Sequence, residues 1–121
     1  MTGDARARRA AFATELALLI EVIRADGEIR DEEIAALRRI AAERGVAFDA
    51  AELRDRMARE PRAADLPDPR GMSRARRNAI VRHMIEVALA DGQLHAAERD
   101  LIRRASERYL LAAPETPVRV A

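Results

Sequence analysis

The sequence contains no cysteine, no tryptophan and no lysine among its 121 residues. Without cysteine, neither disulfide bonds nor thiolate metal ligands are available. All 22 basic residues are arginine, and with 21 acidic residues the formal net charge is +1. A chain so close to neutral has no overall field that would attract nucleic acid or an anionic membrane.

Aromatic and uncharged polar side chains are also scarce. Phe12, Phe48 and Tyr109 are the only aromatic residues, so the chain has no platform on which single-stranded nucleic acid could stack. The arginine groups near residues 6–9 and 74–77 are interpreted as solvated starts of helices. The sequence has no phosphate-binding loop, no dinucleotide fingerprint and no recognisable nucleophile–base pair. We therefore predict that nucleic acid is not a partner.

The apolar residues near the N-terminus do not predict a membrane segment. Glu15 and Glu21 interrupt them, and the longest uncharged core, Leu16 to Ile20, is too short for a signal peptide or a spanning helix. The sequence therefore predicts a cytoplasmic protein with no direct membrane insertion.

What the sequence does contain is an internal repeat. Residues 18–39 and 83–104, offset by 65 positions, are identical at nine of 22 aligned places. Each copy consists of an apolar helical stretch, an Ala-Asp-Gly corner and a second amphipathic stretch. An internal repeat dictates the architecture before any single residue is considered. The identical pairs are Ile20/Ile85, Glu21/Glu86, Val22/Val87, Ala25/Ala90, Asp26/Asp91, Gly27/Gly92, Glu33/Glu98, Arg38/Arg103 and Arg39/Arg104.

Composition and periodicity predict an all-α fold. Hydrophobic residues make up 49% and charged residues 36%, the abundant residues favour helix, and no stretch alternates as a strand would. We predict one domain over residues 1–121, a compact bundle of about five main helices built from an internal duplication. The predicted copies are approximately 10–45 and 75–111, with their first helices packed centrally about a pseudo-twofold axis, and 112–121 form a flexible tail.

Capping signals place the helix boundaries. The five helices are predicted near 4–25, 31–44, 50–60, 73–89 and 96–111. Asp4, Asp49 and Ser73 are candidate N-caps, and Gly27 ends the first helix because glycine adopts a left-handed conformation at low cost. The proline-rich segment 61–72 is predicted to join the two copies.

The two corners share the pattern A-D-G-x-[I/L]-x-x-x-E, which matches the second half of a calcium-binding EF-hand loop. The earlier ligand positions of such a loop hold Val22 and Arg24 in one copy and apolar residues in the other, so an EF-hand is rejected. Reversed His-x-x-Glu spacings at His83 and His95 likewise do not fit a di-iron site.

Two readings of the corner acids stay open. Glu33 and Glu98 can act as helix caps by reaching back to the amides of Arg30 and His95, and Asp26 and Asp91 can accept bonds from corner amides. The repeated Glu21 and Glu86 are expected to pair with Arg24 and Arg82 on their own helices.

The other reading is a cation site formed by Asp26, Glu33, Asp91 and Glu98. If the corners meet at one end of the domain, the two aspartates face each other and repel unless a cation or an arginine lies between them. Hard oxygen ligands without cysteine favour calcium, magnesium or manganese.

At these corners the chain resembles the TerB-like family, the helical domain of bacterial tellurite-resistance proteins and of DjlA-type co-chaperones. The segments I-E-V-I-R-A-D-G-E-I-R-D-E-E at 20–33 and I-E-V-A-L-A-D-G-Q-L-H-A-A-E at 85–98 carry the resemblance, which covers roughly residues 10–111. It implies a compact helical domain, a role in metal-linked or envelope stress, and a divalent-cation site at the same four acids. In the second corner Gln93, Ala96 and Ala97 replace acids of the first.

We therefore expect a non-enzymatic stress-response module that acts by binding a protein partner, with a homodimer as one form of such an assembly. The alternative is a small enzyme that uses the repeated carboxylates as acid and base. Two carboxylates with raised pKa values in a deep pocket would favour the enzyme.

Overall fold

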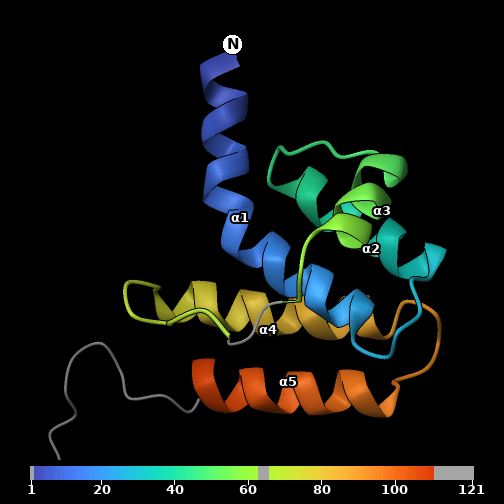
Figure 1. The fold of residues 1–121 in the computed structure, drawn as a ribbon. Helices are drawn as coiled ribbons and strands as arrows, with labels where there is room; N and C mark the ends of the chain where they lie inside the picture. The colour runs from blue at the N-terminus through green and yellow to red at the C-terminus, as the bar shows by residue number, and fades with distance from the viewer. Residues whose placement is uncertain (1, 63–65, 111–121) are drawn as a thin grey trace, which may run out of the picture.

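The computed structural model describes residues 2–62 and 66–110, which form five α-helices (Figure 1). No strand occurs within these two ranges, and the predicted all-α fold is confirmed. The predicted tail, 112–121, lies outside the described residues. The helices are α1 (Thr2–Arg24), α2 (Asp31–Glu43), α3 (Ala50–Arg59), α4 (Arg74–Ala88) and α5 (Ala96–Tyr109).

Side-chain caps fix the starts of two helices as the sequence predicts. The Asp49 carboxylate accepts a hydrogen bond from the Glu52 amide at 2.6 Å, and the Ser73 hydroxyl accepts one from the Arg76 amide at 3.0 Å. Asp4 is not an N-cap, because α1 already begins at Thr2. Asp4 instead lies in the first turn, where an anion interacts favourably with the helix dipole.

The two long apolar helices occupy the centre, as predicted. The contact between α1 and α4 is the largest between any two described helices, α2 and α5 each pack against both of them, and α3 packs on α2. In Figure 1 the C-terminal half of α1 crosses α4, with α2 and α3 on one side of this pair and α5 on the other. The origin of the two copies in a duplication stays a prediction.

One cluster of buried side chains joins the five helices. Leu19, Ile23, Leu37, Leu53 and Met84 have no exposed surface, and burying a side chain of this size contributes about 1.5–3 kcal/mol. This core holds the ends of α1 and α4 together, and with them the two corners. No described helix is both long enough and apolar enough to cross a membrane.

Candidate functional site at the two corners

The two corners have the same local structure. Oδ1 of Asp26 accepts a hydrogen bond from the Glu28 amide at 3.1 Å, and Oδ1 of Asp91 accepts one from the Gln93 amide at 3.0 Å. The intervening glycines have φ angles of 87° and 88°, a left-handed conformation that favours glycine. The predicted bonds from both aspartates to corner amides are therefore confirmed.

Arg30 lies between the two aspartates. Its Nη1 is 2.8 Å from Oδ2 of Asp26 and its Nε is 3.2 Å from Oδ2 of Asp91. The corners thus meet at one end of the molecule, with an arginine rather than open space between them. Burial alone would raise the pKa of Asp26, but the Glu28 amide and the Arg30 guanidinium outweigh it and lower that pKa.

His95 is a second basic side chain at this junction. Its Nε2 is 3.0 Å from Oδ2 of Asp91, and its Nδ1 is 3.8 Å from Oδ2 of Asp26. The hydrogen bond to Asp91 raises the pKa of His95, and the same bond, with the Gln93 amide, lowers the pKa of Asp91. Both aspartates are therefore held ionised by neighbours from the opposite corner as well as their own.

The two glutamates lie beneath the aspartates with no exposed surface. Oε1 of Glu98 accepts a hydrogen bond from the His95 amide at 3.1 Å, which confirms the predicted cap. Glu33 does not cap α2: in the described part of the chain neither of its oxygens accepts a bond from an N–H group, and Arg30 Nη1 is 3.9 Å away.

Glu33 turns instead toward Glu98. Burial, followed by a hydrogen bond with the Glu98 carboxyl, raises the pKa of Glu33 well above its usual range. A proton shared between two buried carboxyl groups avoids the repulsion that two anions would experience there. The four predicted acids are therefore brought together, but in two chemically different pairs.

The sequence did not reveal the bridging role of Arg30 and His95, although it contains a signal for it. These two residues occupy the same place in the repeat, 65 positions apart, and both can carry a positive charge. Each follows its corner aspartate by four residues. A repeat position that keeps a cation while the residue type changes indicates a charge-neutralising role.

Cation binding at Asp26, Glu33, Asp91 and Glu98 stays a prediction. Within residues 2–62 and 66–110 no group of three or more His, Asp or Glu side chains is arranged to hold a metal ion. Arg30 occupies the position between the aspartates at which a cation would bind. The residues in this arrangement do not fit a metal ion unless the Arg30 side chain moves.

The predicted pairs of Glu21 and Glu86 within their own helices are wrong. Glu21 bonds Arg62 at 2.8 Å and Glu86 bonds Arg39 at 3.2 Å, so both pair with a different element. A position three or four residues away on the same helix is reachable, but long arginine side chains from a neighbouring segment reach the same carboxylates.

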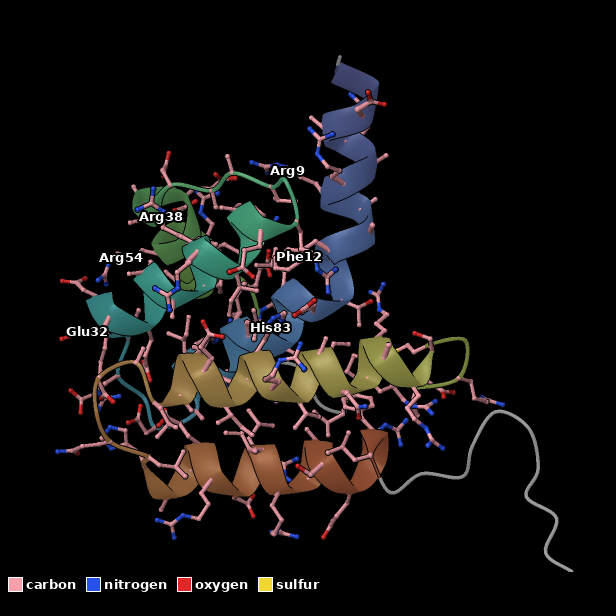
Figure 2. The ribbon with its side chains drawn as sticks, turned by 180° about the vertical axis from the view of Figure 1, so that it is seen from behind. Arg9, Phe12, Glu32, Arg38, Arg54 and His83 are labelled. Carbon is pink, nitrogen blue, oxygen red and sulfur yellow. The ribbon has the colours of Figure 1, made fainter. Side chains whose placement is uncertain are left out.

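A second charged cluster lies between α1, α2 and α4. Glu15, with no exposed surface, is 2.8 Å from Nη2 of Arg44 and contacts Nδ1 of His83. Figure 2 shows His83 on the side of α4 that faces α1. His83 therefore belongs with Glu15 rather than with Glu86, three residues further along its helix. No sequence pattern predicts this cluster, because Arg44 and His83 are 29 and 68 residues away from Glu15.

Comparison with known families identifies the family to which the chain belongs. The family described as tellurite resistance protein TerB matches residues 12–113, most of the chain and both corners. The chain belongs to the TerB family. No curated protein and no solved structure matches it.

The corner of this TerB-family chain is a junction of mutually neutralised charges. Its aspartates have lowered pKa values, and its glutamate of raised pKa has no contact with solvent. A general acid must reach the proton acceptor of a substrate. None of the four acids lines the cavity between α1 and α5. These charges are arranged to hold the two corners together.

Proposed function

We propose that this TerB-family chain is a non-enzymatic module of the tellurite-resistance type that works by binding a protein partner. The observation that carries the proposal is an apolar face on α4. Ile85 and Leu89, one turn apart, are 39% and 47% exposed. Large apolar side chains that stay exposed next to each other are typical of interaction surfaces.

The first copy of the repeat shows what covers such a face. Ile20, the equivalent of Ile85, is only 3% exposed. Arg24, the equivalent of Leu89, donates a hydrogen bond to the carbonyl of Glu60, the residue after α3, at 2.9 Å. A neighbouring segment of the same chain therefore reaches this side of the first copy, and an external helix is the proposed occupant of the equivalent place on the second.

The charges around Ile85 and Leu89 indicate the chemistry of the partner. Arg82 precedes Ile85 by one turn and is exposed, and Arg39 of α2 lies beside Glu86. An amphipathic helix with apolar residues on one side and acidic residues along its border would match this surface. A second copy of the chain, giving a homodimer, is the alternative occupant.

The proposal has three further parts. The module acts in the bacterial stress response to tellurite, as the family description suggests. It works in the cytoplasm, since Glu15 and Glu21 interrupt its apolar N-terminal region and are paired within the fold. A divalent cation of the calcium, magnesium or manganese type reinforces the corner when Arg30 is displaced.

The test combines tellurite tolerance with crosslinking. Bacterial cells expressing the chain are challenged with tellurite, beside cells expressing the Ile85→Glu, Leu89→Glu variant and a Glu107→Gln control on α5. A photocrosslinking residue at position 89 reports what covers the face. We expect the double variant to lose tolerance. We expect the adduct formed from position 89 to map to an acidic amphipathic helix and to be lost when Ile85→Glu is added to the crosslinking chain.

Two results would contradict the proposal. Full tolerance in the folded double variant would separate the face from the function, and an adduct to the same chain would replace the partner by a homodimer. The enzymatic alternative has its own measurement: purified chain incubated with tellurite and a thiol reductant. Tellurite loss that requires Asp26 and Asp91 would favour that alternative.

A further inference from the structure

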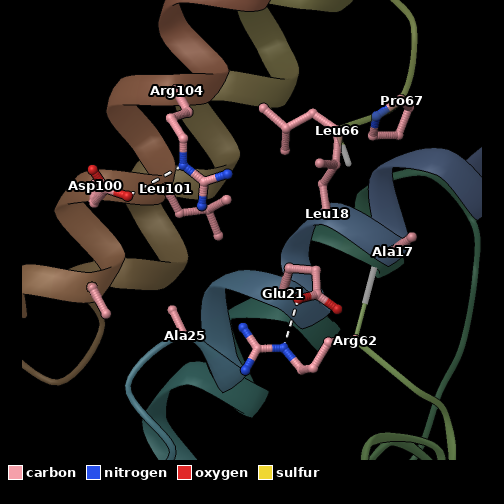
Figure 3. A pocket seen from close by; sticks show the side chains of 11 residues that line it. Ala17, Leu18, Glu21, Ala25, Arg62, Leu66, Pro67, Asp100, Leu101 and Arg104 are labelled. Atoms are coloured by element: carbon pink, nitrogen blue, oxygen red, sulfur yellow. Dashed lines mark hydrogen bonds and ion pairs between the residues drawn. The ribbon is translucent and has the colours of Figure 1, made fainter. Parts of the chain in front are cut away.

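The cavity between α1 and α5 lies at a place whose equivalent in the repeat, between α2 and α4, is closed by an ion pair. Arg39 of α2 and Glu86 of α4 bond at 3.2 Å. Their equivalents one repeat away are Arg104 of α5 and Glu21 of α1. Both equivalents line a cavity of about 270 Å³, shown in Figure 3, and each has a different partner.

Two additional residues account for this difference. Arg62, from the segment after α3, bonds Glu21 through its Nε at 2.8 Å. Asp100, whose equivalent is Ala35, bonds Nε of Arg104 at 3.2 Å. Asp100 thus binds Arg104, and Arg62, from the segment between α3 and α4 (the linker), binds Glu21. Arg104 and Glu21 therefore do not bond each other, and a cavity remains between α1 and α5.

The floor of the cavity is apolar. Leu18 and Leu101 are 2% and 6% exposed, and Leu66 completes the floor from the linker. Alanine side chains at 17, 25 and 97 leave room above them. Ligand pockets in proteins typically combine an apolar lining with a few polar groups and have volumes of about 300–1,000 Å³, so this cavity suits a compact ligand.

The cationic groups of the lining are the guanidinium groups of Arg62 and Arg104. Each arginine uses its Nε for a carboxylate, and the terminal nitrogens of Arg62 and Arg104 have no hydrogen-bond partner among the residues that the structure describes. Figure 3 shows Arg104 extending from α5 and Arg62 from the linker on a different side of the cavity. A guanidinium fork binds a carboxylate through two parallel hydrogen bonds.

We propose that this cavity is a binding site for a small monocarboxylate with a compact apolar body. The apolar part would rest on Leu18, Leu66 and Leu101, and the carboxylate would accept bonds from Arg104 and Arg62. Glu21 and Asp100 balance the charges of the two arginines, so the lining has no net positive charge. A ligand with more than one negative charge would therefore not be held. A phosphate dianion would be repelled by those two carboxylates.

The site contains none of the four corner acids and no residue of the α4 face, so the inference goes beyond the proposed function. It also accounts for a difference between the two equivalent interfaces, α1 with α5 and α2 with α4. The interface between α2 and α4 keeps the Arg39–Glu86 pair closed. It has His83 and Ala36 at the places that Leu18 and Leu101 occupy in the cavity between α1 and α5. The apolar floor and the open arginines therefore occur together on one side of the molecule.

The experiment is an NMR titration of the full ¹⁵N-labelled chain with hexanoate. Hexan-1-ol, hexylammonium and acetate are the comparison probes, since they lack the negative charge, reverse it, or lack the apolar body. We expect hexanoate to give saturable shifts at amides of residues 17–25 and 97–104, with at least tenfold weaker binding of each comparison probe.

Two variants test the geometry. Arg104→Gln removes one fork, and Ala97→Phe fills the space without changing a charge; each is expected to weaken hexanoate binding at least tenfold. Arg99→Gln, an exposed arginine on the same helix outside the cavity, is the matched control and should bind as the wild type does. If Arg104→Gln unfolds, Ala97→Phe alone decides.

Three results would overturn the proposal. The first is the lack of any saturable shift with hexanoate. The second is equal binding of hexylammonium or hexan-1-ol at the same amides, which would show that the arginines do not select the ligand. The third is unchanged hexanoate binding in both Arg104→Gln and Ala97→Phe. These outcomes do not depend on whether the α4 face binds a protein.

Discussion

Glu33 and Glu98, 65 residues apart in the sequence, lie side by side with 0% of their surface exposed. Burial and the neighbouring carboxyl raise the pKa of Glu33, so the folded protein retains a proton there that the unfolded chain releases. The pair is buried directly beneath a cluster of ionised groups. The junction therefore combines a buried Glu33 of raised pKa with two aspartates of lowered pKa.

The first prediction concerns the pH dependence of stability. Above the ordinary glutamate pKa of 4.5 the unfolded state binds fewer protons at Glu33 than the folded state. The free energy of unfolding therefore falls as pH rises from there toward the folded pKa. Glu33→Gln removes this titration, and it should flatten the pH dependence and stabilise the protein by on the order of 1 kcal/mol at about pH 8.

Urea unfolding at about pH 5 and about pH 8 measures the effect. Glu32→Gln is the matched control, because Glu32 is the exposed neighbour on the same helix. Its two unfolding curves should differ by the same amount as those of the wild type. If Glu33→Gln also behaves like the wild type, the proton is not shared in the folded state.

The second prediction is that Arg30 is the main cation that stabilises the corner. Arg30→Gln leaves Asp26 and Asp91 facing each other with only His95 between them, so we expect it to lower the midpoint of urea unfolding clearly. Arg99→Gln, an exposed arginine with no side-chain partner in the described residues, should change stability by less than about 0.5 kcal/mol. Equal losses in the two variants, measured by urea unfolding, would contradict a special role for Arg30.

The third prediction follows from the position of Arg30 between possible metal ligands. Calorimetric titration of calcium, magnesium and manganese should give tighter binding to Arg30→Gln than to the wild type, because two ionised carboxylates are then left without their arginine. The same titration of the Asp26→Asn, Asp91→Asn double variant should give no binding. If the Arg30→Gln chain does not bind any of the three ions, the corner is purely structural.

Most of the fold could be predicted because it depends on local signals. The caps at Asp49 and Ser73, the left-handed glycines and the apolar faces are all read from a few neighbouring residues. The repeat raised the meeting of the two corners only as a condition for a cation site, and the structure meets that condition because Arg30 contacts both aspartates. The prediction that both glutamates cap their helices is confirmed for Glu98 and wrong for Glu33.

What could not be predicted is which charged groups meet across helices. Glu21 pairs with Arg62 and Glu15 with Arg44, at separations of 41 and 29 residues. With 22 arginines and 21 acids, the sequence offers many combinations of similar energy. Packing of the apolar side chains selects among them, because it sets the positions of the helices to which the charges are attached.

The fourth prediction concerns His95. The hydrogen bond to Asp91 raises its pKa above 6.5, so the contribution of charged His95 to stability is fully present below that pH and is lost as pH rises through the folded pKa. NMR titration of the imidazole protons measures the pKa directly. In Asp91→Asn it should fall toward or below the ordinary value, and an unchanged pKa would show that Asp91 does not stabilise the imidazolium.

The last prediction compares a buried ion pair with an exposed one. Glu15 has no exposed surface and is held by Arg44 and His83, whereas Glu52 forms an exposed pair with Arg9 at 3.2 Å. Glu15→Ala leaves cationic or polar partners without their acceptor and opens a cavity, so it should cost about 3 kcal/mol. Glu52→Ala should cost less than about 1 kcal/mol, because water replaces the carboxylate. Both are measured by urea unfolding at neutral pH. Should Glu15→Ala cost no more than Glu52→Ala, the buried cluster does not stabilise the packing of α1 against α2 and α4.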